Sequence, residues 1–233
     1  MEAVILAGGM GKRLRKIVKD VPKPMAPVNN KPFLFYLLHW ISKYPVEKVI
    51  ISVGYKAGSI RDYFGDSFEN IPLVYETEEM PLGTGGAIVK ALKNTTGSDM
   101  LIMNGDTWFP VDLNKFYSSH ISVKSTFSIA LKRMQKFSRY GSVECREGKI
   151  TKFNEKKFCE GGLINGGIYL VNRSFFESRL FPDKFSLEND ILVKAAGTSV
   201  LNGVIFDDPF IDIGTPEDYQ RASILINKNL LLK

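Results

Sequence analysis

A glycine-rich segment near the start of the chain has the residue types that bind phosphate groups. Glycine allows the backbone to turn tightly and to bring its N–H groups against the phosphates of a ligand. The segment Leu6–Leu14 therefore predicts a nucleotide-binding loop, and a plain glycine turn between a strand and a helix is the alternative. Its three glycines and two basic residues are Gly8, Gly9, Gly11, Lys12 and Arg13.

The spacing within this loop excludes two common phosphate-binding motifs. A P-loop has the pattern Gly-x-x-x-x-Gly-Lys-Ser/Thr, but here Leu6 occupies the first glycine position and Arg13 replaces the hydroxyl residue. A Rossmann dinucleotide fingerprint requires a third glycine, and Leu14 stands at that position. The loop therefore indicates a different class of nucleotide-binding protein.

The next motif holds one lysine between two prolines. Pro22, Pro24 and Pro27 restrict the backbone of residues 22–27, so we expect an extended, stiff segment from which Lys23 projects. Taken alone, Lys23 would be interpreted as a surface lysine. After a glycine-rich loop, it is typical of a charge positioned for a ligand.

These two motifs resemble the opening of the sugar-1-phosphate nucleotidyltransferases. In that family a glycine-rich loop ending in Gly-x-Arg-Leu is followed by a Pro-Lys-Pro segment. The resemblance continues in the family's order and covers nearly the entire chain. Five further segments carry it: Leu82–Ala87, Asn104–Asp106, Asn154–Lys156, Asn165–Gly167 and Ile211–Thr215.

The resemblance implies a role for each matching residue. Arg13 would stabilise the departing pyrophosphate, and Lys23 would act at the phosphates where the reaction occurs. The residues implied to bind the nucleotide are Leu6, Gly8, Gly9, Gly11, Lys12, Glu78, Gly83 and Thr84. Those implied to bind the sugar phosphate are Asn104, Gly141, Glu155, Lys156, Asn165 and Gly166.

Within the sugar-binding group, the resemblance implies that Glu155 accepts hydrogen bonds from sugar hydroxyls and that Lys156 holds the sugar phosphate. Asn165, with the backbone of the two glycines, would fix the ring. A solvated hairpin rim is the preferred interpretation of each polar residue taken singly. The family often has proline after Glu-Lys, whereas Lys157 follows here, a departure that bears on the placement of Lys156.

The same resemblance implies that Asp106 and Asp212 share a magnesium ion. Mg²⁺ takes hard oxygen ligands and usually needs only one or two protein carboxylates besides water and substrate phosphates. Asp106 follows the apolar run Met100–Met103, so it lies at the carboxyl end of a strand, where ligands bind in open α/β sheets. Taken singly, Asp106 is better interpreted as a turn aspartate and Asp212 as a side-chain cap. The presence of both aspartates together favours the metal.

Glu78 predicts the choice of base. In the thymidylyl- and uridylyltransferases that the chain resembles, an amide side chain at this distance before the glycine that matches Gly83 pairs with a pyrimidine. An ionised carboxylate only accepts hydrogen bonds, and guanine offers two adjacent donors at N1 and N2. The sequence therefore predicts GTP, with a solvated acidic turn that includes Glu76 and Glu79 as the alternative.

The run 20–34 looks most like that of the bacterial D-glycero-α-D-manno-heptose 1-phosphate guanylyltransferases. Mannose-1-phosphate guanylyltransferases and short uridylyltransferases come next. The expected reaction transfers a nucleoside monophosphate from a nucleoside triphosphate to a sugar 1-phosphate, through in-line attack on the α-phosphorus, and releases pyrophosphate.

Two other classes of protein fit the sequence less well. Sugar-transferring glycosyltransferases usually carry an Asp-x-Asp metal motif, but Asp106 is followed by Thr107 and Trp108. A non-catalytic nucleotide-sugar sensor should have lost one of the charged phosphate contacts, and all of them are present.

The composition is that of a folded globular chain of 233 residues, with 44% hydrophobic and 24% charged residues. Cys145 and Cys159 have no Cys-x-x-Cys spacing, so no zinc site is expected. The net charge of +6 is dispersed, which disfavours a nucleic-acid partner. The longest apolar stretch, Phe33–Ile41, is too short for a membrane span. Met1-Glu2 leads straight into Ala3–Leu6 with no basic n-region or cleavage-site pattern, so we expect no signal peptide. We therefore expect a cytoplasmic protein without a membrane partner, and the sequence leaves a homo-oligomer open.

Alternating strand and helix patterns must position these motifs in the first half of the chain. They predict a single-domain, Rossmann-like α/β fold with a mixed, mostly parallel sheet flanked by helices and a smaller antiparallel sugar-binding part. The nucleotide-binding part would cover about residues 1–110 and the remainder about 111–233. The expected strands are Ala3–Leu6, Val49–Val53, Leu73–Tyr75 and Met100–Met103, and the expected helices are Pro32–Tyr44, Gly58–Phe64 and Gly85–Lys93.

The sequence after Asp106 is rich in strand patterns. A hairpin turn is expected at Glu147-Gly148, and a closing helix should begin with Thr215 as its cap. The remaining expected elements are the strands Thr126–Leu131, Gly141–Cys145, Lys149–Phe153, Gly167–Val171 and Gly203–Phe206, and the helix Leu187–Ala196.

Overall fold

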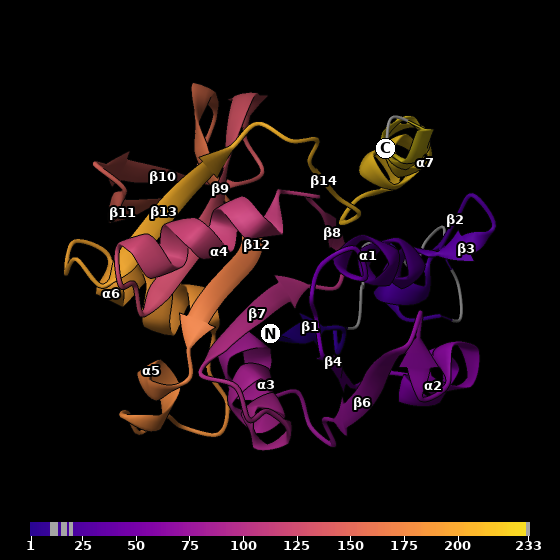
Figure 1. Cartoon of the computed structure of the whole chain (residues 1–233). Helices are drawn as coiled ribbons and strands as arrows, with labels where there is room; N and C mark the ends of the chain where they lie inside the picture. Colours follow the sequence, from indigo (N-terminus) through magenta and orange to yellow (C-terminus); the bar gives the residue numbers. More distant parts are fainter. Residues whose placement is uncertain (10–13, 15–17, 19–20, 232–233) are drawn as a thin grey trace.

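The computed structural model of the chain describes residues 1–9, 14, 18 and 21–231. In these residues, ten strands form one sheet with helices on both faces (Figure 1). Their order across the sheet is β10 (Gly141–Arg146), β11 (Lys149–Lys156), β13 (Leu201–Phe206), β9 (Phe127–Phe137), β12 (Cys159–Asn172), β7 (Asp99–Asn104), β1 (Glu2–Leu6), β4 (Lys48–Val53), β6 (Ile71–Thr77) and β5 (Ser67–Phe68).

Four neighbouring strands, β7, β1, β4 and β6, run parallel. The register pairs Leu6 with Ser52 on one side and with Asn104 on the other, so these strands end at the same edge of the sheet. The predicted alternation of strands and helices in this half is confirmed. The helices between the strands are α1 (Phe33–Ile41), α2 (Ala57–Phe64) and α3 (Gly83–Ala91), the last continued by the short η3 (Leu92–Asn94).

Strand β12 is antiparallel to β7 and joins this part to the predominantly antiparallel half. Strands β9 and β12 are both longer than predicted, because their pairing continues as far as Phe137 and Cys159, and β12 also pairs with β10 there. The β10–β11 hairpin turns at Glu147 and Gly148, whose φ angles of 49° and 74° are both positive, as a tight two-residue hairpin requires. Strand β13 runs parallel to β9. The predicted mixed sheet is confirmed.

The strand-rich interpretation of the second half omitted two helices, α4 (Leu113–Ser122) and the four-residue α5 (Ser174–Glu177). The longer of the two is α4. Asp112 caps it, because its side chain accepts hydrogen bonds from the backbone N–H groups of Asn114 (2.9 Å) and Lys115 (3.1 Å). Leu113 and Phe116 are buried beneath the helix. An aspartate cap followed by apolar residues three positions apart is a helix signal, and it was available in the sequence.

Alternate residues of the central strands face two separate hydrophobic cores. Ala3 and Ile5 point into one core, and Val4 points into the other. The first core packs under α1, α2, α4 and the C-terminal helix α7 (Pro216–Leu231). The second packs under α3 and α5 (Ser174–Glu177), together with η4 (Leu187–Leu192). Both faces of the sheet are therefore covered, as its continuous apolar strands require.

Two helical predictions for the last third of the chain are confirmed. Residues 187–195 are helical, as a π-helical turn, η4, that continues into α6 (Val193–Ala195). Helix α7 begins at Pro216, and its capping residue Thr215 accepts a hydrogen bond from the backbone N–H of Asp218 at 3.3 Å. No helix in the described ranges is long and apolar enough to cross a bilayer.

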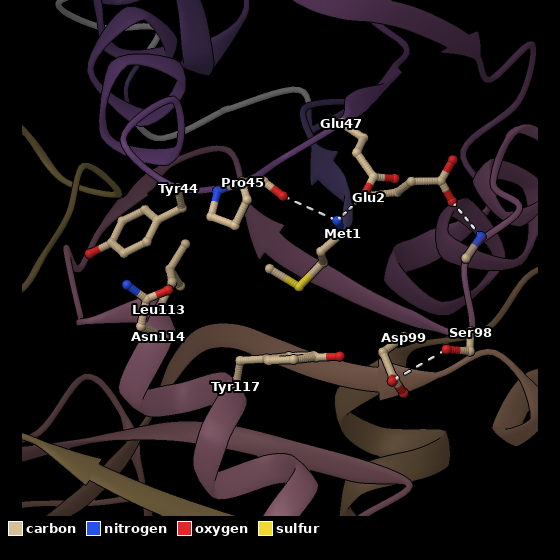
Figure 2. Close-up of a pocket in the computed structure, with 11 residues that line it drawn as sticks. Met1, Glu2, Tyr44, Pro45, Glu47, Ser98, Asp99, Leu113, Asn114 and Tyr117 are labelled. Atoms are coloured by element: carbon tan, nitrogen blue, oxygen red, sulfur yellow. Dashed lines mark hydrogen bonds and ion pairs between the residues drawn. The ribbon is translucent and has the colours of Figure 1, made fainter.

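Buried Glu2 ties the start of β1 to the turn before β7. Figure 2 shows its carboxylate beside a cavity of about 420 Å³ at the amino ends of these strands. One oxygen accepts hydrogen bonds from the backbone N–H groups of Thr96 and Gly97, both at 2.7 Å, and the other lies 2.8 Å from the Lys48 ammonium. Burial alone would raise the pKa of Glu2, but these contacts outweigh it and lower the pKa from 4.5 to about 2.

We expect Glu2→Gln to lower the free energy of unfolding by about 3 kcal/mol at pH 7, because the folded state holds the ionised carboxylate more strongly than the unfolded chain does. Since the folded pKa is depressed, this stabilisation is present above pH 4.5 and is lost as the pH falls toward 2. Urea unfolding of both proteins between pH 3 and pH 7 measures it. Glu47→Gln is the control, because the Glu47 side chain is 75% exposed; a Glu2 effect independent of pH would contradict the assignment.

Candidate functional site

A pocket of about 320 Å³ opens at the carboxyl ends of β1 and β7. This is the edge at which ligands bind in open α/β sheets. Eight of the residues that the sequence singled out line it: Leu6, Gly8, Gly9, Glu78, Gly83, Thr84, Asn104 and Asp106. The remaining lining residues, Pro81, Ala87 and Glu188, were not predicted. The predicted Gly11, Lys12 and Arg13 lie outside the described residues.

Close backbone packing holds Asp106 beside the start of the glycine-rich loop. The N–H of Gly105 donates to the carbonyl oxygen of Leu6 at 3.0 Å. A Cβ atom at Gly105 would lie 2.8 Å from that same oxygen, closer than real Cβ atoms approach. Only glycine therefore allows the segment after β7 to approach β1 this closely.

A short ribbon brings the two predicted metal ligands together. Strand β8 (Thr107–Trp108) pairs antiparallel with β14 (Ile211–Asp212), with Asp212 opposite Thr107. The N–H of Ile213 also donates to the carbonyl oxygen of Asp106 at 3.0 Å. Asp106 and Asp212, distant in the sequence, thus become neighbours across a two-stranded ribbon.

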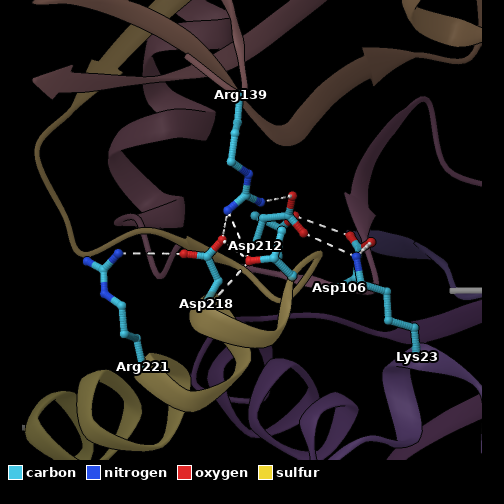
Figure 3. A network of polar contacts seen from close by, with 8 residues as sticks. Lys23, Asp106, Arg139, Asp212, Asp218 and Arg221 are labelled. Atoms are coloured by element: carbon cyan, nitrogen blue, oxygen red, sulfur yellow. Dashed lines mark hydrogen bonds and ion pairs between the residues drawn. The ribbon is translucent and has the colours of Figure 1, made fainter. Parts of the chain in front are cut away.

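The ammonium group of Lys23 bridges the two aspartates (Figure 3). Its Nζ atom lies 2.5 Å from Oδ2 of Asp106 and 3.2 Å from Oδ1 of Asp212. Burial by itself lowers the pKa of Lys23, but the two carboxylates outweigh it and raise the pKa, so the lysine stays charged. Burial and the charge of Asp106 raise the pKa of Asp212, while Lys23 and Arg139 oppose that shift.

The segment that carries Lys23 differs from the predicted extended chain. Pro22 is extended, but Lys23–Met25 form the 3₁₀ turn η2. The N–H of Met25 donates to the carbonyl oxygen of Pro22 at 2.8 Å. The extended prediction was wrong because the φ angle fixed by proline also suits the first helical turn, where the N–H that proline lacks has no partner. Buried Pro24 and Met25 still anchor the lysine.

The two aspartates fit a divalent metal that takes most of its ligands from elsewhere. Their carboxylates already converge on one cationic group, the ammonium of Lys23. Within the described part of the chain, no group of three or more His, Cys, Asp or Glu side chains converges on a metal-sized site. Mg²⁺ commonly binds one or two protein carboxylates together with water and phosphate oxygens.

Arg139, which the sequence analysis missed, supports Asp212 from the other side (Figure 3). Its guanidinium bonds to Asp218, donates to Oγ1 of Thr215 at 3.2 Å and lies 3.9 Å from Oδ2 of Asp212. The neighbouring Tyr140 is half-buried. Its partial burial and the charge of Asp212 raise the pKa of Tyr140 to about 12, so its hydroxyl stays protonated. The only sequence signal for Arg139 was its position just before the predicted Gly141.

Glu78 differs from the exposed Glu79 next to it, because its half-buried side chain lines the pocket. Oε1 of Glu78 accepts a hydrogen bond from Oγ of Ser52 at 3.1 Å, and Oε2 accepts one from the N–H of Leu82 at 3.0 Å. A Cβ atom at Gly8 would lie 2.5 Å from Oε1. The carboxylate is therefore fixed against the glycine-rich loop.

The predicted sugar-binding residues occupy two different places. Asn165 lies near Asn104, because the backbone at Gly167 packs against the Asn104 side chain. Nδ2 of Asn165 donates to the hydroxyl of Tyr169 at 2.9 Å, and its Oδ1 accepts from the N–H of Gly167 at 2.9 Å. Gly166 packs against the ring of Phe109.

The other three sugar-binding residues lie where β10 meets β11. Lys156 pairs in register with Gly141, the residue that follows Tyr140. Glu155 and Lys156 are exposed and do not line the pocket of about 320 Å³ in the part of the chain that the structure describes. Their predicted contacts with a sugar remain predictions.

Residues 2–229 match the model of the nucleotidyl transferase family. The chain belongs to that family. It is 48% identical over 222 residues to a D-glycero-alpha-D-manno-heptose 1-phosphate guanylyltransferase from Aneurinibacillus thermoaerophilus, covering 95% of this chain and 96% of that protein. A protein of the same name from Campylobacter jejuni is 44% identical over 220 residues, covering 94% and 97%.

Solved structures agree with the family assignment. The crystal structure of HddC from Yersinia pseudotuberculosis complexed with GMP-PN has a TM-score of 0.85 and 37% sequence identity, covering 96% of this chain and 98% of that one. The resemblance to sugar-1-phosphate nucleotidyltransferases and the predicted fold class are confirmed.

A double-mutant cycle of Arg139→Met and Asp218→Asn should show an energetic coupling of about 1–3 kcal/mol between the two residues. The reason is that removing the guanidinium leaves the carboxylate of Asp218, which is only 12% exposed, without its closest cation. Urea unfolding measures the coupling. Arg221→Met is the matched control, since this 76% exposed arginine also contacts Asp218, at 3.5 Å. Equal losses of stability in the two arginine variants would contradict a special role for Arg139.

Proposed function

We propose that the protein transfers GMP from GTP to D-glycero-α-D-manno-heptose 1-phosphate, producing a GDP-heptose and pyrophosphate. One observation carries the proposal: the lysine and the two aspartates meet at the edge of the sheet where the glycine-rich loop and Glu78 form a pocket. The near-full-length similarity to guanylyltransferases of this specificity supports the choice of substrates.

The chain's own residues must overcome the repulsion between two anionic substrates. The sugar phosphate already carries an anionic oxygen that can attack the α-phosphorus, so the reaction needs no protein nucleophile. Lys23 supplies a charged ammonium beside Asp106, which lines the pocket, and we assign Arg13 and Lys156 to further phosphate oxygens. Catalysis then consists of holding the attacking and leaving oxygens in line and neutralising their charge.

We assign Asp106 and Asp212 as the protein ligands of Mg²⁺. Enzymes of this family generally use a divalent metal ion. When bound, the ion would supply positive charge to the phosphate oxygens and orient them. When the metal ion binds, Lys23 would remain near the phosphates that the ion contacts, because the Lys23 ammonium already lies within 3.2 Å of both carboxylates.

Purified protein, incubated with GTP and Mg²⁺, should release pyrophosphate with the heptose 1-phosphate faster than with mannose 1-phosphate or glucose 1-phosphate. Asp106→Asn and Asp212→Asn should each lower kcat by roughly 100-fold or more, because each removes an anionic ligand and no core volume. Circular dichroism would verify that both variants fold. Near-normal turnover of Asp106→Asn at ordinary Mg²⁺ concentrations would exclude the assigned metal site.

We further expect Glu78→Gln to lower kcat/KM for GTP, because a carboxylate engages the two donors of guanine and an amide places its own donor against them. A mismatched contact of this kind in a desolvated pocket is worth roughly 2–5 kcal/mol. The amide can still accept the hydrogen bond from the N–H of Leu82, so the local fold should persist.

The measurement compares GTP, ATP, UTP and dTTP in the wild type, in Glu78→Gln and in the control Glu79→Gln, which alters the exposed neighbour. A pyrimidine preference in the wild type would refute base selection by Glu78. So would a GTP preference that Glu78→Gln leaves unchanged.

A further inference from the structure

The glycines of the segment Leu82–Ala87 serve close packing against a distant part of the chain. A Cβ atom at Gly85 would collide with the ring of Phe185, and one at Gly86 would collide with the carbonyl oxygen of Asp183. Gly83 has a φ of 74°, and a side chain there would strike the backbone of Phe185. These glycines therefore allow the segment 183–187 to lie directly on the start of α3.

Hydrogen bonds fix this contact. The N–H of Gly85 donates to the carbonyl oxygen of Phe185 at 3.1 Å. The N–H of Phe185 donates to the carbonyl oxygen of Leu82 at 3.0 Å. The N–H of Leu187 donates to Oγ1 of Thr84 at 2.8 Å. The two segments, about a hundred positions apart in the sequence, thus form one wall of the pocket.

Glu188 is the side chain that this contact brings into the pocket. Its Oε2 atom accepts hydrogen bonds from Oγ1 of Thr84 at 2.7 Å and from Oγ of Ser186 at 2.9 Å. Among the described residues, none forms a hydrogen bond with its Oε1 atom and no Lys, Arg or His lies within ion-pair distance of the carboxylate. Glu188 also belongs to a π-helical turn, a feature often found at functional sites.

The two glutamates that line the pocket have different neighbours. Glu78 packs against Gly8 of the glycine-rich loop. Glu188, by contrast, lies near Tyr169, since burial and the charge of Glu188 together raise the pKa of that tyrosine, and Asn165 bonds to the same hydroxyl. Glu78 is thus associated with the glycine-rich loop, and Glu188 with the Tyr169 and Asn165 side chains of strand β12.

We propose that Glu188 determines specificity for the acceptor sugar by accepting a hydrogen bond from one of its ring hydroxyls. A carboxylate beside the reacting phosphates repels anions, so the group that it accepts from must be a neutral donor, and a sugar hydroxyl provides one. Thr84 and Ser186 act as positioning residues, because both donate to Oε2 and leave Oε1 without a donor among the described residues. This inference rests on the proposed transfer to a sugar 1-phosphate.

The test uses Glu188→Gln, which keeps the shape of the side chain and an oxygen for Thr84. We expect the KM for the sugar 1-phosphate to rise roughly 10- to 100-fold, because the variant loses a hydrogen bond between the sugar and a charged group. The affinity for GTP, measured by calorimetry without the sugar, should change by less than about twofold, since the lost contact is made to the other substrate. The preference for the heptose over mannose 1-phosphate should also narrow.

Asp190→Asn is the matched control. Asp190 lies two positions away, accepts a hydrogen bond from the N–H of Ser186 at 2.9 Å and does not line the pocket. If Glu188 only stabilised this turn, both variants would behave alike, and that result would overturn the proposal. A weakened affinity for GTP, or a lost preference for GTP over its 2′- or 3′-deoxy forms, would place Glu188 at the ribose and overturn it as well.

A wild-type enzyme that prefers a different sugar 1-phosphate would disprove the proposed substrate and leave the proposal for Glu188 open to the same measurement with that acceptor. An unchanged KM for the preferred acceptor in Glu188→Gln would disprove the proposal for Glu188 alone. The two failures are therefore distinct.

Discussion

The ammonium of Lys23, held between the carboxylates of Asp106 and Asp212, is the interaction on which the site depends. Two like-charged, partly buried carboxylates repel each other, and a cation between them stabilises them side by side. The main sheet does not bring them together: the β8–β14 ribbon does, and α7 begins just after it. The position of the C-terminal helix and the geometry of the reacting centre are thus set by the same contact.

Carboxylates dominate the described pocket, although the proposed substrates are anions. Asp106 has a cation beside it, whereas Glu78 and Glu188 are held mainly by backbone N–H and hydroxyl donors. This arrangement separates phosphate binding from the recognition of neutral groups. Phosphates belong where Lys23 and a metal ion can neutralise them, and the uncompensated carboxylates are suited to neutral donors such as a base edge or a sugar hydroxyl.

The glycines of the segments Asn104–Asp106 and Leu82–Ala87 contribute to this site in different ways. Gly105 allows one strand end to approach another, and Gly83, Gly85 and Gly86 allow the segment 183–187 to pack on α3. A glycine motif can therefore mark a binding site without itself touching the ligand, because the absence of a side chain permits two backbones to meet and bring a third residue into position. Glu188 reaches the pocket in this way.

The sequence by itself determined the order of strands and helices in the parallel half and the hairpin at Glu147-Gly148, because these follow from local patterns. Its resemblance to a known family also identified eight of the eleven residues that line the pocket, at the shared edge where parallel strands end. It missed α4 and the short α5. It also predicted an extended chain where η2 turns, because a proline restricts φ without deciding between the two conformations. Only the tertiary structure decided that Arg139 supports Asp212 and that Glu188 lines the pocket. Such contacts join residues as far apart as the 189 positions between Lys23 and Asp212, and strand pairing and backbone packing set them, which no local pattern encodes.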